Sequence, residues 1–200
     1  MYVFRVSCVS ATEPVTVEEL KSHLRVETTH DDTYLGLCIT AARQTAKNLL
    51  RRSLVNTEWV LTIDSFQDKI ELPMAAPLST IATDVAIRYT NSSGAEATVN
   101  SSCYYVDRRA EPAFIREATD SEWPDNIGDA EGAVSITYRA GYSSVTPPAT
   151  VAPVAIQHWI KQRAAQMYEF REPIITGTIQ SELPRDYIDG LLDPYRLPTL

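Results

Sequence analysis

The fold is decided by a long helix predicted over residues 31–53, which read DDTYLGLCITAARQTAKNLLRRS. Its apolar positions recur at steps of three and four residues: Leu35, Ile39, Ala42, Ala46 and Leu49. This spacing places them on one face of an α-helix. Asp31 or Asp32 is expected to cap the N-terminal end, where a carboxylate also favours the helix dipole. A helix with such a stripe must bury it against other elements, so further helices are expected nearby.

Two more helices are predicted, one on each side of this stretch. Thr16-Val17-Glu18-Glu19 has the form of a capping box, so a helix should start at Thr16 and stop near Arg25. A third should run from about Thr150 to Arg171, with Pro153 tolerated only in its first turn. The apolar positions of the third helix are Val151, Val154, Ala155, Trp159, Ala165 and Tyr168. The three helices are expected to bury their stripes against one another.

Between the helices the apolar period changes from that of a helix to that of a strand. Trp59, Leu61 and Ile63 alternate with more polar residues, which is strand spacing. Further strands are expected at 69–72, 85–89, 103–106, 113–115 and 133–138, the last ended by Gly141. Short strands separated by turn residues favour an antiparallel sheet or a small sandwich. The predicted fold class is therefore α+β, a helical core with an inserted antiparallel β region and a C-terminal tail.

The composition excludes several classes of protein. The chain has 200 residues and a formal net charge of −8, which argues against a protein that coats DNA but suits a wall past which DNA slides. No apolar run is long enough for a membrane span, and the N-terminus does not resemble a signal peptide. The cysteines Cys8, Cys38 and Cys103 are widely spaced, which indicates free thiols.

No motif for catalysis, a metal or a cofactor is recognisable. The seven glycines are scattered, and no nucleophile elbow, Walker loop, dinucleotide fingerprint or paired-cysteine site occurs. His23, His30 and His158 have no spacing that requires them to converge, so surface or packing roles are favoured. The expectation is a protein that is not an enzyme and carries no cofactor.

Two charged features suggest interaction surfaces. An acidic loop with eight acidic residues and three arginines is expected from Asp107 to Glu131. It is either a solvated loop or a surface that faces a partner or a channel lumen. The residues it would present are Asp120, Glu122, Asp125, Asp129 and Glu131. Arg43, Lys47 and Arg51 share one helix face. That face is either solvated or a basic seam, which could close a ring against the acidic loop of a neighbour.

The C-terminal segment is expected to be a linker over residues 174–183 followed by a short helix from about Arg185 to Leu192. It is rich in potential anchor residues: Tyr187, Ile188, Leu191, Leu192, Tyr195, Arg196 and Leu197. Such a segment can order on binding a partner. The alternative is a helix that folds back on its own domain.

Taken in order along the chain, these patterns resemble the head–tail connector (adaptor) family of tailed bacteriophages. No single motif is specific, but their order and spacing cover nearly the whole chain. The segments that carry the resemblance are 17–26, 31–32, 41–43, 50–54, Trp59, 70–73, 76–78, 105–107, 136–142, 168–172 and 191–196. The N-terminal fifteen residues and the acidic loop depart from the family pattern, so the resemblance assigns them no role.

The resemblance implies a structural virion protein of the neck, made in the host cytoplasm. It implies a homo-oligomeric ring, commonly a dodecamer, that docks under the portal protein, meets a tail-side neck protein and lets DNA pass without specific binding. It implies one connector domain over residues 1–200, with helical parts 14–53 and 147–192 and a β insertion at 54–142. The C-terminal anchor residues would then grip the portal. The alternatives are another neck component, such as a stopper or tail-completion protein, and a ligand-binding β module.

Overall fold

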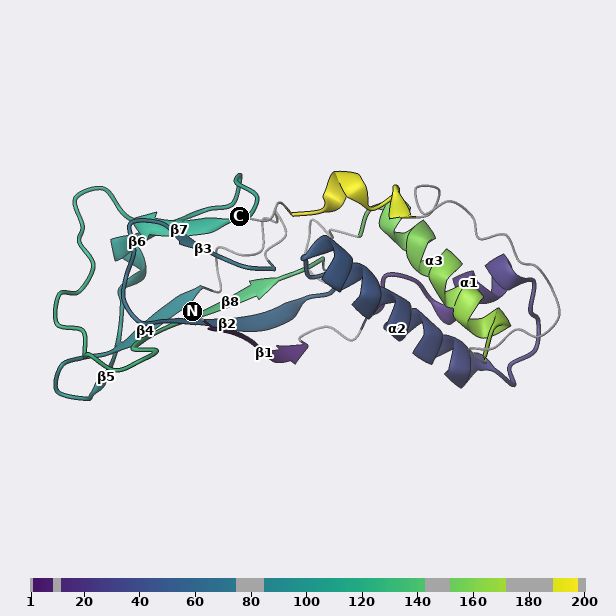
Figure 1. Ribbon diagram of the computed structural model, residues 1–200, viewed down its shortest axis with the longest axis horizontal. Helices are drawn as coiled ribbons and strands as arrows, with labels where there is room; N and C mark the ends of the chain where they lie inside the picture. Colours follow the sequence, from purple (N-terminus) through teal and green to yellow (C-terminus); the bar gives the residue numbers. More distant parts are fainter. Residues whose placement is uncertain (1, 9–11, 75–84, 143–151, 172–188, 198–200) are drawn as a thin grey trace. The chain divides into compact units, whose positions relative to one another are not determined.

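The computed structural model describes residues 2–8, 12–74, 85–142, 152–171 and 189–197 (Figure 1). Contacts divide the chain into two compact units. The helical unit comprises Thr12–Leu54 and Val151–Arg196, and the β unit comprises Met1–Ala11, Val55–Thr150 and Leu197–Leu200. Two N-terminal helices, one C-terminal helix and antiparallel sheets between them confirm the predicted α+β class.

Helix α1 (Val17–Leu24) begins where the sequence predicts. The Thr16 hydroxyl accepts a hydrogen bond from the Glu19 backbone N–H at 3.2 Å, and the Glu19 carboxylate accepts one from the Thr16 N–H at 3.2 Å. This reciprocal capping box satisfies two backbone donors that no helical carbonyl can reach. The helix ends at Arg25, which adopts a left-handed conformation with φ 58°.

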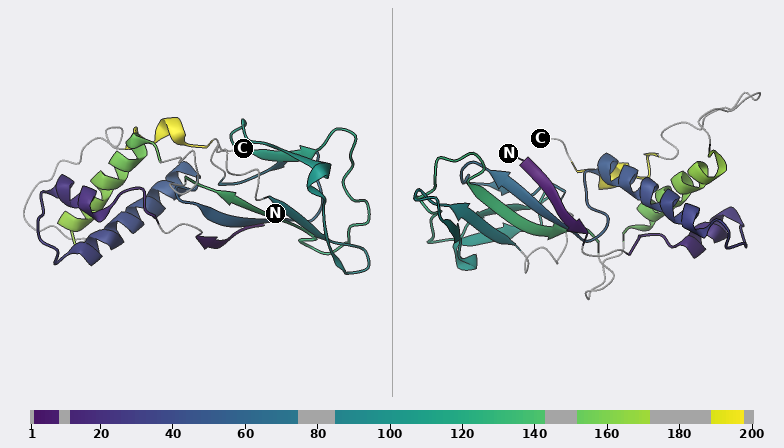
Figure 2. Two further views of the ribbon diagram at one scale, coloured as in Figure 1. Left: turned by 180° about the vertical axis from the view of Figure 1, so that it is seen from behind. Right: turned by 90° about the horizontal axis from the view of Figure 1, so that it is seen from below.

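Helix α2 (Asp32–Leu50) is the longest of the described elements. Four of its five predicted stripe residues, Leu35, Ile39, Ala42 and Ala46, are fully or almost fully buried, whereas Leu49 is half-buried and Leu50 is buried instead. The helix packs against α3 (Val154–Glu169), and the two helices lie side by side in every view (Figure 2). Asp31 is the N-cap residue of α2, but its side chain makes no capping hydrogen bond. The expected side-chain cap is wrong because the Asp31 carboxylate is used elsewhere, as described below.

The buried face of α3 differs from the predicted one. Ile156, Trp159, Ile160 and Ala164 are buried, whereas Val154 is 79% exposed. The helix contains two overlapping apolar rows, and the row with two isoleucines and the tryptophan buries more apolar surface. Pro153 is the N-cap residue of α3, so it lies just before the helix and not within its first turn as predicted.

The β unit contains two antiparallel sheets. The five-stranded sheet has the order β1 (Tyr2–Cys8), β2 (Thr57–Ile63), β8 (Val134–Ala140), β4 (Ala86–Thr90) and β5 (Glu96–Thr98). The three-stranded sheet has the order β3 (Ile70–Glu71), β7 (Phe114–Glu117) and β6 (Tyr104–Asp107), with the short 3-10 helix η2 (Ser101–Cys103) before β6. Strand β1, from the N-terminal stretch to which the resemblance assigns no role, pairs antiparallel with β2 of the same chain.

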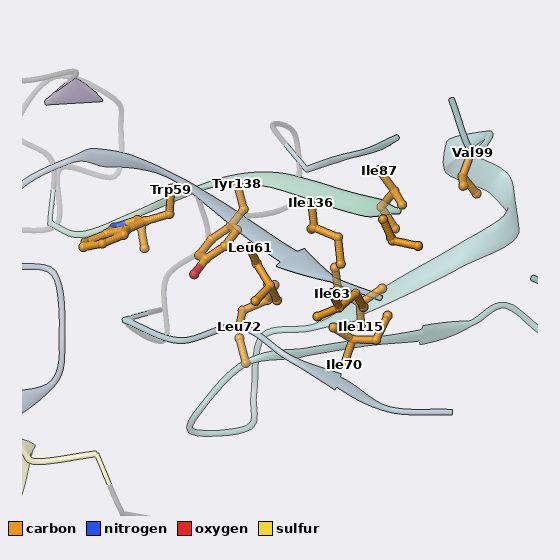
Figure 3. Close-up of a cluster of buried hydrophobic side chains, with 13 residues drawn as sticks. Trp59, Leu61, Ile63, Ile70, Leu72, Ile87, Val99, Ile115, Ile136 and Tyr138 are labelled. Atoms are coloured by element: carbon orange, nitrogen blue, oxygen red, sulfur yellow. The ribbon is translucent and has the colours of Figure 1, made fainter. Parts of the chain in front are cut away.

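The core of the β unit is formed by side chains of both sheets (Figure 3). Burial alternates along β2 and β8, so every second residue enters the core, as the period of two predicts. From the five-stranded sheet the core takes Trp59, Leu61, Ile63, Ile87, Val134, Ile136 and Tyr138; from the other layer it takes Ile70, Leu72 and Ile115. The buried Tyr138 hydroxyl donates to the Pro73 carbonyl, so its polar atom is satisfied.

Gly141 ends β8, as predicted, for a steric reason. It has φ 121°, and a Cβ atom at this position would lie 2.0 Å from the Val55 carbonyl oxygen. Only glycine lets the two backbone segments of the β unit approach so closely. β5 was not predicted, because Glu96-Ala97-Thr98 has no apolar alternation.

Candidate functional site

The candidate site residues are charged side chains and residues of the C-terminal segment, which could form interaction surfaces. Among the described residues no group of three His, Cys, Asp or Glu side chains could hold a metal ion. None of the described helices has the length and apolarity needed to cross a bilayer. Cys38 and Cys103 are free thiols.

The predicted basic face of α2 is not assembled as expected. Arg43 is only 9% exposed, and its Nε donates to Glu13 Oε2 at 2.6 Å. Thr40 donates to the other oxygen of the same carboxylate at 3.0 Å. Including Arg43 in a basic seam is therefore a wrong prediction, because its charge is neutralised within the chain. Lys47 is half-buried and Arg51 is exposed just after the helix.

The predicted acidic loop is shorter than expected, because β7 and its hairpin with β6 occupy the first part of it. The remaining segment, Ala118–Ala133, connects β7 to β8. All five proposed residues, Asp120, Glu122, Asp125, Asp129 and Glu131, are exposed on it. The segment from 118 to 133 contains no lysine or arginine, so it presents an excess of negative charge to solvent.

The loop is held to the β unit at several points along its length. Trp123 stacks on Phe66 with ring centroids 4.5 Å apart, and its backbone N–H donates to Glu117. Ile127 bridges to Asn91, and the Gly132 N–H donates to Asp64 at 2.8 Å. A ring contact and backbone hydrogen bonds anchor the loop, while its five proposed acidic residues stay exposed. The anchor was not predicted, although a tryptophan within a polar stretch could have indicated it.

Part of the C-terminal segment packs on its own helical unit. Leu192 is fully buried, Asp189 accepts a hydrogen bond from Trp159 Nε1 at 3.0 Å, and the Tyr195 carbonyl accepts one from Arg52. Asp193–Tyr195 forms a 3-10 turn, η3. This supports the alternative that the segment folds back.

The remaining anchor candidates differ in exposure. Leu197 is also buried, whereas Leu191 and Tyr195 are half-buried and Arg196 is exposed. Tyr187 and Ile188, the linker at 174–183 and the first half of the predicted last helix lie outside the described residues. The anchor role of this segment stays a prediction.

A polar and aromatic cluster that the sequence did not reveal joins the start of α2 to the end of α3. The Asp31 carboxylate accepts from the Tyr168 hydroxyl at 2.7 Å and from Arg171 at 3.0 Å. The Arg171 guanidinium also lies over the rings of Tyr34 and Tyr168, 4.7 and 4.9 Å from their centroids. We call these four residues the Asp31 cluster. No local pattern could have linked Asp31 to residues so far along the chain.

Electrostatics in the Asp31 cluster favour the charged carboxylate. The hydrogen bond from Tyr168 holds the pKa of Asp31 below its ordinary value, and Arg171 adds to this effect. The same hydrogen bond raises the pKa of Tyr168, because losing the phenol proton would place two negative charges together. The cluster therefore stabilises the helix packing at neutral pH without presenting a reactive group.

The fold was compared with solved structures. The chain is similar to one from the neck of an empty GTA particle, with a TM-score of 0.74 and 24% identity. It is also similar to one from the virion of a native gene transfer agent (GTA) particle, with a TM-score of 0.73 and 22% identity, and to one from a native GTA neck computed with C12 symmetry, with a TM-score of 0.71 and 23% identity. Each match covers 100% of this chain and 97% of the other. The shared fold therefore includes both units.

The sequence was also compared with protein-family models and with curated proteins. The curated proteins gave no match. The family model for phage gp6-like head-tail connector proteins matches residues 14–115, which extend from the segment before α1, through α2, to β7. This is half of the chain, and it agrees with the resemblance carried by the helix signals and the Trp59 strand. The chain belongs to the phage gp6-like head-tail connector protein family.

Proposed function

We propose that this chain is a non-enzymatic structural protein of the neck of a tailed phage or phage-like particle. Identical copies form a ring between the portal and the tail, and the ring continues the channel through which DNA passes. The observation that carries the proposal is the family match over residues 14–115. The shared fold with chains of GTA necks supports it, since the likeness extends over the whole chain.

The two units are proposed to act as one connector domain. The helical parts, 14–53 and 147–192, form the ring, and the β insertion, 54–142, carries the acidic loop. A ring of copies with net charge −8 presents a strongly negative wall. Such a wall repels a polyanion and prevents DNA from adhering during its passage. The exposed carboxylates between 118 and 133 suit either this lumen or the surface that a tail-side neck protein meets.

The C-terminal segment is proposed to contact the portal protein. Because Leu192 is buried and Leu197 is almost fully buried, they are not presented to a partner in this conformation. The contact therefore uses Leu191, Tyr195 and Arg196, together with Tyr187 and Ile188, or it requires residues 189–196 to leave the helical unit. Many weak contacts acting together give a ring high avidity for a portal of matching symmetry.

Cryo-microscopy of particles that contain this chain tests the proposed function. We expect density for a closed ring of this fold directly below the portal, with DNA or an open channel on its axis. A ring placed further down, in contact only with tail proteins, would instead identify a stopper or tail-completion protein. Density for this fold in the capsid shell or the tail tube, or its absence from the particle, would refute a neck role.

A further inference from the structure

The outer side of α2 carries a continuous row of exposed residues. Thr33, Leu37, Ala41, Gln44 and Asn48 follow one another at steps of four, four, three and four, and all five are exposed. These steps keep the residues on one narrow face of an α-helix, opposite the face that packs inward. We call this row the α2 stripe.

The α2 stripe contains no charged residue. The charged side chains of α2 lie off this row: Asp32 pairs with Lys21, Arg43 is buried on Glu13, and Lys47 is half-buried. By contrast, exposed positions of the other two helices include Glu18 and Glu19 on α1 and Arg163 and Glu169 on α3. The solvated face of a helix is ordinarily rich in charge, so a face of this length without any needs an explanation.

Leu37 lies on this face as a large apolar side chain that is 63% exposed. Ala41, one turn later, is small enough to let another backbone element come close. Gln44 and Asn48 can donate and accept hydrogen bonds without bringing a net charge to a contact. In its lack of charge the row resembles an interface core, from which charged residues are depleted.

We propose that the α2 stripe is a contact surface between neighbouring copies of this chain. The partner is identified by charge. Copies that each carry −8 repel one another, so identical subunits can approach most easily where both electrostatic repulsion and the cost of desolvating a charge are absent. Among the three described helices, α2 offers that surface. The inference rests on the proposed ring, and it replaces the basic seam predicted on the same helix.

The size of the stripe sets the strength of the contact. A helix of 19 residues is about 28 Å long, and one face of it covers less than the roughly 800 Å² per partner of a stable interface. One such contact is weak, so the isolated chain should associate only at high concentration. In a ring the contact is heterologous, so the stripe meets a different surface of its neighbour.

Photo-crosslinking of the full-length chain tests the contact directly. Benzoylphenylalanine replaces Leu37, and in a control chain it replaces Gln166, an exposed residue of α3. At high protein concentration we expect crosslinked dimers and higher species from position 37 and few from position 166. Peptide mapping should join position 37 to a surface of the second copy other than its α2 stripe.

Charge substitutions test the physical reason. Leu37→Glu and Leu37→Lys should each weaken self-association about tenfold or more in sedimentation, because both bury a charge at the contact. Gln166→Glu is the matched control and should leave association unchanged. Circular dichroism checks folding, which should persist because Leu37 is largely in water and leucine, glutamate and lysine have similar helix propensities. Stronger association of Leu37→Lys would mean that long-range repulsion, not packing of the stripe, governs the contact.

Three outcomes would overturn the inference. These are equal crosslinking from positions 37 and 166, crosslinks from position 37 only to the same stripe of a two-fold dimer, and a chain that neither associates nor crosslinks at any concentration. Each would exclude the α2 stripe as the ring contact. The neck role would still stand or fall on the location of the chain in the particle.

Discussion

The helical unit and the β unit are stabilised by different kinds of contact. The β unit has a two-layer core of large side chains, in which Leu61, Ile136 and Ile115 are fully buried. In the helical unit α2 packs on α3 through smaller residues, such as Ala42 and Ala46. Side-chain hydrogen bonds between distant segments also stabilise this unit. The stability that comes from apolar burial does not depend on pH, whereas that of hydrogen bonds and ion pairs depends on charge and geometry. The comparison predicts that the two units respond differently to substitution.

The largest expected effect is in the core of the β unit. Ile136 is fully buried and lies opposite both Leu61 on β2 and Ile87 on β4. Ile136→Ala should lower the free energy of unfolding by about 2–5 kcal/mol, because it removes apolar contact and leaves a cavity. Urea unfolding measures the loss. Thr137→Ala, the next residue along β8 and on the other face, should cost less than about 1 kcal/mol. Equal losses would contradict the two-layer core.

The next effect concerns the buried leucine near the end of the chain. Leu192→Ala should lower the free energy of unfolding by about 2–3 kcal/mol. This is the lower end of the range for a buried leucine, because the short segment around Leu192 can move to fill part of the cavity. Hydrogen exchange should become faster in peptides from α3 and stay unchanged in β2 and β8. Leu191→Ala, at the half-buried neighbour, is the control and should have little effect. Unchanged exchange in Leu192→Ala would show that residues 189–196 do not stabilise the helical unit.

Local signals account for most of the fold that could be predicted. The capping box of Thr16 and Glu19 and the alternation of Trp59, Leu61 and Ile63 depend on residues close in sequence, and both predictions are confirmed. Predictions failed where competing local patterns existed. In α3 two apolar rows overlap, and packing within the helical unit decides that Ile156 is buried and Val154 is not.

The candidate surfaces were less predictable, since exposure depends on partners distant in sequence. Arg43 was predicted on a basic face, but Glu13 neutralises it from another segment. The α2 stripe was not predicted, because it contains no charged or reactive residue that would mark it as a functional surface. The Asp31 cluster joins residues more than 130 positions apart, and no spacing rule relates them.

A smaller effect is expected at the start of α1. Thr16→Ala removes one half of the capping box and should lower the stability of the helical unit by about 1 kcal/mol, because the Glu19 N–H loses its acceptor. Thermal unfolding followed by helical circular dichroism measures the change. Ser22→Ala, at an exposed position inside the same helix, should be neutral or slightly stabilising, since alanine favours helices. Equal melting of Thr16→Ala and the wild type would argue against the cap as a source of stability.

The smallest effect is expected at Asp31, where the stability of the helical unit, unlike that of the β unit, should depend on pH. Asp31 has a lowered pKa in the folded chain, so its stabilising contribution is fully present above the ordinary carboxyl pKa of about 3.9 and is lost as pH falls through the lower folded value. Asp31→Asn cannot form the ion pair with Arg171. The stability difference between wild type and variant should therefore be largest near neutral pH and shrink below about pH 4.

Hydrogen exchange in α2 and α3 measures this difference, and the β unit serves as an internal reference that should show no such trend. Glu18→Gln, at an exposed position of α1, controls for the general loss of one negative charge. Equal stability of wild type and Asp31→Asn at every pH from 7 to below 4 would mean that the ion pair contributes nothing. The Tyr168 hydrogen bond and ring contacts, which an amide can keep, would then be what joins the two helices at this end.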